Sequence, residues 1–270
     1  MDESAKAGLR KRGLEAVFPG MPDVRAVTAA DIGSALAAGL ADFRRAPAFG
    51  LFFGAVYAMG GLIIALSLAL WHVPWLIYPC AIGFPLIGPF IAVGLYEVSR
   101  RLERGETLSW PGVLGFVWAQ RRRELGWMAF VMLFIFWVWM YQIRLLIALV
   151  LGRLSFSTLP KFVDIVLTTP EGWLFLVLGH IVGAVLALIL FSLTVVSVPL
   201  LMERDLDIVT AMATSVRAVL ASPVPMLGWG VVVTLLVLAG AASAFIGLVV
   251  VLPVLGHATW HLYRAIIPPA

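Results

Sequence analysis

The sequence predicts an all-α membrane protein of six transmembrane helices, built as three tandem units that each combine an interfacial amphipathic helix with a helical hairpin. Three observations predict this fold class: an apolar composition, several apolar runs of membrane-spanning length, and a sequence pattern that recurs in each pair of runs. Of the 270 residues, 62% are hydrophobic and 13% are charged. A soluble domain is about 45–50% apolar and about 25% charged, so this composition excludes a soluble globule.

The apolar runs define the predicted spans. A hydrocarbon core of about 30 Å takes about 20 helical residues to cross, and runs of this length occur at 48–70, 76–98, 126–148 and 173–198. A fifth run, 226–263, would form a helix nearly twice as long as the membrane is thick. We expect it to fold back at Gly240–Ser243, which gives six spans, whereas one long span would give five.

The basic residues predict the orientation. Sixteen Lys and Arg lie in the N-terminal segment, the second and fourth loops and the C-terminus, whereas Arg153 and Lys161 lie on the opposite side. Basic loops stay in the cytoplasm, so both termini are predicted to be cytoplasmic. The first thirty residues contain no apolar segment of a cleavable signal peptide. Residues 1–27 are predicted to be a polar cytoplasmic segment, and residues 28–264 a single integral membrane domain.

A segment of similar design precedes each hairpin. Asp31 and Asp207 are each followed sixteen residues later by a proline, Pro47 and Pro223, so the two segments align at an offset of 176. The middle segment, from Ser109, has the same length but lacks the proline. Asp and Ser are good helix N-caps. The apolar spacing i, i+4, i+8 and i+11 predicts amphipathic helices that lie in the membrane interface, with one apolar side made of Ile32, Leu36, Leu40 and Phe43, or of Ile208, Met212, Val216 and Val219. Ordinary cytoplasmic linker helices are the alternative.

The returning helix of each hairpin carries an apolar–Pro–apolar–apolar pattern, centred on Pro85, Pro199 and Pro253. Proline removes a backbone hydrogen bond and bends a membrane helix. The recurrence predicts an internal repeat of about 31–104, 109–204 and 207–264, arranged around a pseudo-threefold axis along the membrane normal. Since proline and glycine are common in membrane helices, chance recurrence is the alternative.

Few polar side chains lie in the predicted spans, and the candidates for function are His180, His257, His261, Glu97 and Arg144. His257 and His261 share a helix face and could chelate a metal, but no carboxylate or thiolate near them in sequence completes a site, so polar packing is favoured. His180 and His257 differ in predicted depth by about 10 Å, which argues against one haem iron between them. We predict no catalytic, cofactor-binding or metal-binding residues, and no cofactor.

The charged candidates are interpreted as boundary residues. Arg144 is expected to snorkel to the outer boundary of its span. Glu97 reaches Arg101 at i+4 and is expected to lie in a solvated helix extension. No predicted span has a central Asp, Glu or Lys, which disfavours an ion-coupled pump. The basic run Arg121–Arg123 favours anionic lipid, although the topology rule alone also explains it.

Three stretches carry a family resemblance: Ala38–Phe43 with Ala46 and Pro47, Gly83–Phe90 with Gly94–Arg101, and Leu252–Arg264. Through them the chain resembles a family of uncharacterised bacterial polytopic integral membrane proteins, some of which are labelled as cytochrome c oxidase proteins. The resemblance implies a bacterial inner-membrane protein. A catalytic oxidase subunit needs histidines from several helices, which this sequence lacks, whereas a cofactor-free accessory or assembly role is compatible with it.

Two functions are therefore expected to compete. The first is a non-enzymatic inner-membrane protein, an accessory or assembly component whose interfacial helices contact lipid or a membrane complex. The second is a small-solute or lipid transporter with a path between the three units. A dry axis filled by Leu and Val favours the first function, and a polar cavity beside the three prolines favours the second. A haem-binding redox protein is a less favoured third, and no nucleic-acid partner is expected.

Overall fold

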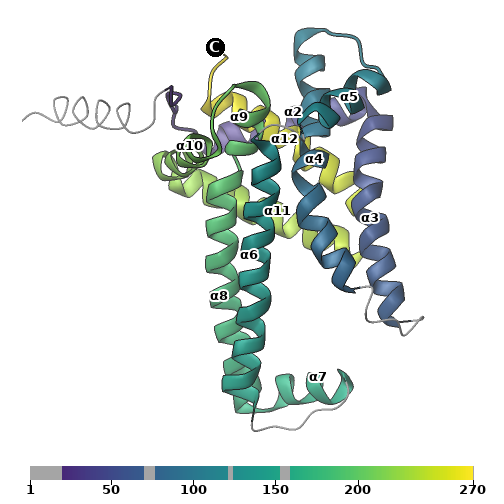
Figure 1. Cartoon of the computed structure of the whole chain (residues 1–270), viewed down its shortest axis with the longest axis vertical. Helices are drawn as coiled ribbons and strands as arrows, with labels where there is room; N and C mark the ends of the chain where they lie inside the picture. The colour runs from purple at the N-terminus through teal and green to yellow at the C-terminus, as the bar shows by residue number, and fades with distance from the viewer. Residues whose placement is uncertain (1–19, 70–76, 121–123, 153–158, 270) are drawn as a thin grey trace, which may run out of the picture. The chain divides into compact units, whose positions relative to one another are not determined.

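The computed structural model describes residues 20–69, 77–120, 124–152 and 159–269, and this part of the chain is 85% helix without a strand. The predicted all-α class is confirmed at this level. The helices (Figure 1) are α2 (Ala29–Arg45), α3 (Pro47–Ala69), α4 (Ile77–Arg104), α5 (Trp110–Gln120), α6 (Leu125–Leu146), a π-helix η2 (Ile147–Leu151), α7 (Leu159–Thr168), α8 (Pro170–Thr194), α9 (Ser197–Glu203), α10 (Ile208–Ala221), α11 (Pro223–Ala242) and α12 (Leu248–Ile266).

Four helical stretches are long and apolar enough to cross a membrane: Pro47–Ser67, Leu125–Leu151, Pro170–Glu203 and Pro223–Ala242. The helices α4 and α12, expected to be two further spans, do not meet this criterion within the described residues. The last apolar run does break, because α11 ends at Ala242 and α12 begins at Leu248. The break lies directly after the segment at which we expected the chain to fold back.

The chain divides into two compact units, Met1–Ala129 with Ser192–Ala270, and Phe130–Phe191. In the second unit, α7 packs on the start of α8, where Ile165 and Val166 form a small core with Leu151. A Cβ atom added to Gly172 would lie 2.3 Å from the Ile165 carbonyl oxygen, so α7 reaches α8 closely only because residue 172 is a glycine.

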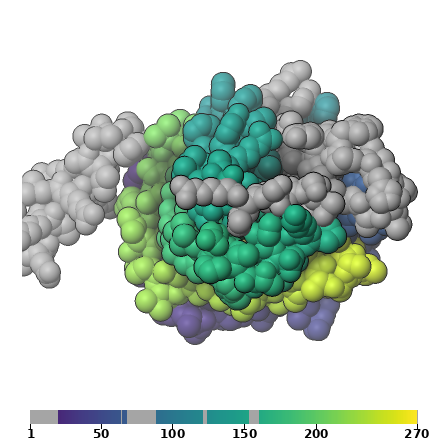
Figure 2. All heavy atoms as spheres, turned by 90° about the horizontal axis from the view of Figure 1, so that it is seen from below, coloured from purple at the N-terminus to yellow at the C-terminus, as the bar shows by residue number. Residues whose placement is uncertain are grey.

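The core of the first unit forms around α12, which packs against α2, α3 and α4. Two glycines let the helices touch along their backbones. A Cβ atom at Gly39 of α2 would lie 2.4 Å from the Ala258 nitrogen, and one at Gly54 of α3 would lie 2.4 Å from the Val249 carbonyl oxygen. The start of the described chain, in purple, and its end, in yellow, therefore lie side by side (Figure 1, Figure 2).

The helix before each hairpin is present. The first begins earlier than expected, because Thr28 caps α2 and Asp31 is its partner in a reciprocal capping box. Asp207 caps α10 as predicted, with Oδ1 accepting the Thr210 N–H at 2.9 Å. Ser109 Oγ accepts the Gly112 N–H at 3.3 Å and starts α5.

The fully buried face of α2 is not its large apolar face. The large apolar residues that make this helix amphipathic are half-buried, namely Ile32, Leu36, Leu40 and Phe43. The buried face instead consists of Ala35, Gly39 and Asp42. These small residues let α2 approach α12 until their backbones are in contact. The face of α2 that is covered is therefore the one with the smallest side chains, and not the one with the largest apolar side chains.

The three pattern prolines differ in their surroundings. Pro253 is buried inside α12. Pro199 is the third residue of α9, and the bend is a break between α8 and α9 that precedes the proline. Proline is tolerated in the first turn of a helix, where its missing N–H needs no partner. Pro85 lies within α4, and its side chain is outside the described part, as are Arg121–Arg123.

Candidate functional site

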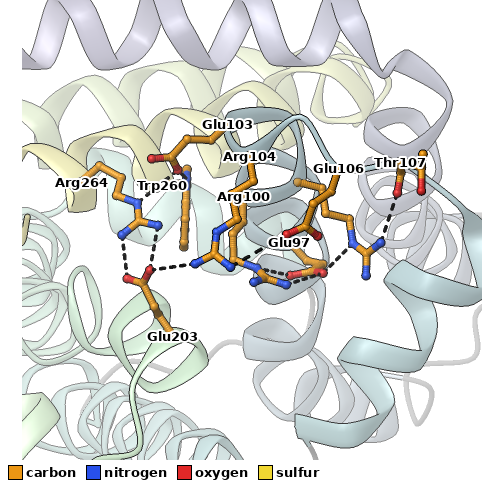
Figure 3. Close-up of polar contacts among 10 residues, drawn as sticks. Glu97, Arg100, Glu103, Arg104, Glu106, Thr107, Glu203, Trp260 and Arg264 are labelled. Atoms are coloured by element: carbon orange, nitrogen blue, oxygen red, sulfur yellow. Dashed lines mark hydrogen bonds and ion pairs between the residues drawn. The ribbon is translucent and has the colours of Figure 1, made fainter. Parts of the chain in front are cut away.

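A polar cluster of the first compact unit, here called the ionic network, forms where α4, α9 and α12 meet. Its members are Glu97, Arg100, Arg101, Glu103 and Arg104 of α4, Glu203 of α9, and Trp260, Tyr263 and Arg264 of α12. Figure 3 shows the side chains of Arg100, Glu203 and Arg264 pointing toward one another from the three helices.

Glu97 is the most enclosed member of the network. Its carboxylate accepts hydrogen bonds from Arg100 Nε at 2.7 Å and Nη2 at 2.9 Å, and from Arg101 Nε at 2.6 Å. The Glu97 side chain is 0% exposed, so the expectation of a solvated helix extension is wrong at this residue. The neighbouring helices α5, α9 and α12 cover this end of α4 and exclude water from the pair.

Glu203 and Arg264 join α9 to α12. Arg264 Nη1 donates to Glu203 Oε2 at 2.8 Å, and Nη2 lies 2.7 Å from Oε1. Tyr263 Oη donates to the same carboxylate at 2.5 Å. Arg264 Nε also donates to Glu103 at 3.1 Å, which brings α4 into the same set of contacts. Trp260 lies beneath the guanidinium group, with 4.6 Å between Arg264 Cζ and the ring centroid.

The ionic network acts as a clamp, which means that its ion pairs hold the helices together. Glu97, Glu103 and Glu203 each accept at least two hydrogen bonds or ion pairs from nitrogen or hydroxyl donors. Charge-assisted and two-pronged bonds of this kind are about twice as strong as neutral ones. An external anion or metal ion would have to displace these bonds, so the arrangement favours holding helices together over binding a ligand.

A second polar cluster, here called the histidine cluster, joins α2, α4 and α12. His261 Nε2 lies 2.7 Å from Asp42 Oδ2, and Ser99 Oγ lies 2.8 Å from His257 Nδ1. His257 is fully buried. Its Nε2 makes no hydrogen bond of regular geometry within the described residues, although the Leu95 carbonyl is close enough to interact with the ring.

Asp42 is the acid of the histidine cluster. Burial raises the pKa of its carboxyl group, but the hydrogen bonds from His261 and Ser99 outweigh burial and hold the pKa below its usual value. The carboxylate is therefore ionised at neutral pH. Sequence alone placed no carboxylate near the histidines, and the fold supplies one from α2. Within the described residues, no three His, Cys, Asp or Glu side chains are arranged to hold a metal ion.

The remaining predicted candidates lie in the second compact unit. His180 is exposed on α8, and its Nδ1 lies 2.7 Å from the Leu176 carbonyl oxygen of its own helix. Arg144 is exposed in the last turn of α6. Of the predicted candidates, the structure therefore brings together His257 and His261, and it places Glu97 in the adjoining ionic network.

Sequence reasoning missed the partners of these residues, above all Asp42, Ser99 and Glu203. Of these three residues, only Asp42 has a sequence pattern that indicates a buried partner. It lies at helical spacing from Ala35, Gly39 and Ala46, and a charged group on a face of small residues must find a partner when that face is buried. Ser99 and Glu203 stand next to ordinary charged helix ends, so nothing in their local sequence distinguishes them.

An all-helical chain with four apolar helices of membrane-spanning length, exposing large apolar side chains along α6 and α8, is an integral membrane protein. Residues 77–203, which are 127 of the 270, match the model of a family described as "Predicted integral membrane protein (DUF2189)". The expected family resemblance is confirmed over this stretch. The match includes Glu97 and Glu203 and ends before Arg264. No curated protein and no solved structure shows a significant match.

Proposed function

We propose that the protein is a non-enzymatic bacterial inner-membrane protein that acts as an accessory or assembly component of a membrane complex. The observation that carries the proposal is the ionic network. It fastens three helices with bonds that leave no free carboxylate in Glu97 or Glu203, and a rigid bundle of this kind suits a structural role.

The filling of the same junction supports this choice. Val93 of α4, Leu200 of α9 and Trp260 of α12 are all completely buried. A transport path between α4, α9 and α12 would have to pass these bulky side chains and the ion pairs. A filled junction supports a structural role.

We propose six spans, with α4 and α12 as the two beyond the candidate spans. The register of α2 and α10 supports an internal repeat. An offset of 176 superposes the helix starts Pro47 and Pro223, and it also matches buried positions with buried positions, namely Ala35 with Ala211, Gly39 with Ser215, Asp42 with Ala218, and Ala46 with Ser222. A chance recurrence of prolines would not be expected to carry the burial pattern with it.

The order of helix packing supports a pseudo-threefold arrangement of the three proposed units. The short helix of the second unit, α5, packs on the returning helix of the first, α4. The short helix of the third unit, α10, packs on α9, the end of the second unit's returning helix. The short helix α2 packs on the returning helix α12, so the third unit closes onto the first. A cyclic order of this kind is what rotation about one axis produces.

In this proposal both termini and the ionic network lie on the cytoplasmic side, and residues 28–264 form one membrane domain. An alkaline phosphatase fused after Ala270 is active only outside the cytoplasm. We expect the fusion to be inactive, and a green fluorescent protein at the same position to fluoresce. The opposite result would overturn the six-span topology.

A small-solute or lipid transporter is the second candidate, and the histidine cluster is the observation in its favour. A buried histidine and a buried aspartate are costly within a membrane protein and often mark a functional path. The two functions differ in a lipid-scrambling assay, in which dithionite bleaches nitrobenzoxadiazole-labelled phosphatidylcholine in liposomes. We expect no bleaching beyond that of protein-free liposomes, and faster bleaching would support the transporter.

The accessory role is tested by purifying the tagged protein from its native membrane after mild cross-linking. We expect a partner protein at stoichiometric amounts, which should be lost when Arg264→Gln loosens the bundle and retained with the exposed control Arg104→Gln. Recovery of the chain alone, with both variants folded, would contradict an accessory role.

A further inference from the structure

We infer that α5 is a docking surface for anionic phospholipid in the cytoplasmic leaflet. The helix has eleven residues and is too short to cross a membrane, and its sequence is almost wholly apolar. Two sides of the helix differ in their burial. Val113 and Gln120 are buried, whereas Trp110, Leu114 and Trp118 are exposed at i, i+4 and i+8, with Trp118 67% exposed.

The buried side holds α5 in a fixed orientation. Val113 is packed in a core with Ala46, Phe49 and Val98. The Arg100 guanidinium carbon lies 5.1 Å from the Phe116 ring centroid, and Arg101 Nη1 donates to the Thr107 carbonyl at 3.2 Å in the loop that leads to α5. The exposed stripe is therefore held at the level of the ionic network, where the charged end of α4 marks the membrane boundary.

Tryptophan is the side chain best suited to this depth, because its ring is apolar and its N–H reaches the polar headgroups. A stripe of two tryptophans and a leucine facing water would be costly, whereas the same stripe at the headgroup level of a bilayer is favourable.

The positive charge of two arginines favours an anionic lipid as the ligand of this docking surface. Arg44 and Arg45 end α2 and are both exposed. The chain continues from them to Phe49, whose ring stacks on Trp110 with 4.1 Å between centroids. Two exposed arginines therefore precede, by four and five residues, the ring that stacks on Trp110. In the proposed docking they bind a lipid phosphate while the indole rings contact the glycerol region. The inference rests on the cytoplasmic orientation in the proposed function, but not on any protein partner.

The test uses the full-length protein in nanodiscs of mixed phosphatidylcholine and phosphatidylglycerol, with either lipid brominated on its acyl chains. The emission of Trp118 is obtained as the difference between the wild type and Trp118→Phe. We expect brominated phosphatidylglycerol to quench this emission more than brominated phosphatidylcholine at equal mole fraction. Each arginine should contribute an enrichment of about fivefold, the factor expected from about 1 kcal/mol per basic residue.

The double variant Arg44→Gln with Arg45→Gln should abolish the preference but keep the quenching by both lipids, and Lys161→Gln in α7 serves as the charge-matched control without effect. Equal quenching by both lipids in the wild type would overturn the anionic preference. Access of aqueous acrylamide to Trp118, or shielding from both acrylamide and lipid, would overturn lipid docking. A partner recovered from native membranes in either case would leave the accessory role standing.

Discussion

Arg264 and Glu203 form a two-pronged ion pair between α12 and α9, with nitrogen–oxygen distances of 2.7 and 2.8 Å. The two side chains are 11% and 13% exposed. Because Arg264 also donates to Glu103 of α4, one guanidinium group connects three helices that are far apart in sequence. The stability of the bundle should depend on this contact more than on any other surface charge described here.

We expect Arg264→Gln to destabilise the protein by about 3 kcal/mol, because it leaves the largely buried carboxylate of Glu203 without its main counterion. Arg104→Gln is the matched control. Arg104 lies 3.8 Å from the same carboxylate but is 46% exposed, so its loss should cost less than about 1 kcal/mol. Thermal unfolding in detergent micelles, followed by tryptophan emission, measures both variants. Equal losses would show that the network is not a clamp.

The contact between α2 and α12 gives a second prediction, made within a single helix. Gly39→Ala places a methyl group against the Ala258 backbone and should cost about 1–3 kcal/mol, because backbone cannot move aside as a side chain can. Gly33→Ala has no atom within 4 Å of the added Cβ and should stabilise α2 by about 1 kcal/mol. The same unfolding measurement applies, and a stabilising Gly39→Ala would rule out the direct backbone contact.

The local features of the fold were predictable from sequence, and the tertiary ones were not. The cap at Asp207, the ends of α2 and α10 just before Pro47 and Pro223, and the break after Ala242 follow from rules that act over a few residues. The buried face of α2 was not predicted, because which face is covered depends on α12, more than 200 residues away. Glu97 was mistaken for a solvated residue for the same reason. Charge spacing within one helix reveals an ion pair but not the helices that bury it.

Asp42 predicts a pH dependence. Its pKa is lowered on folding, so its contribution to stability is fully present above the unfolded value of about 3.8 and is lost as the pH falls through the lower folded pKa. In Asp42→Asn this dependence should disappear, while the variant is less stable than the wild type at neutral pH. Unfolding temperatures of both proteins between neutral pH and the acid range give the comparison. Parallel curves would mean that the carboxylate is not bonded to His261 and Ser99.

The turn between α11 and α12 contains two residues other than glycine in the left-handed region, Ala244 at a φ of 53° and Phe245 at 66°. Phe245 has a packing reason for its conformation, because its ring contacts Gly61 of α3. Ala244 is exposed, so no packing contact compensates for the strain of its backbone conformation. A left-handed conformation costs an L-residue about 1–2 kcal/mol, whereas glycine adopts it freely.

Ala244→Gly should therefore stabilise the protein by about 1 kcal/mol, whereas Ala213→Gly within α10 should destabilise it by about the same amount. If both substitutions destabilised the protein equally, the turn would not have the left-handed geometry that reverses the chain into α12.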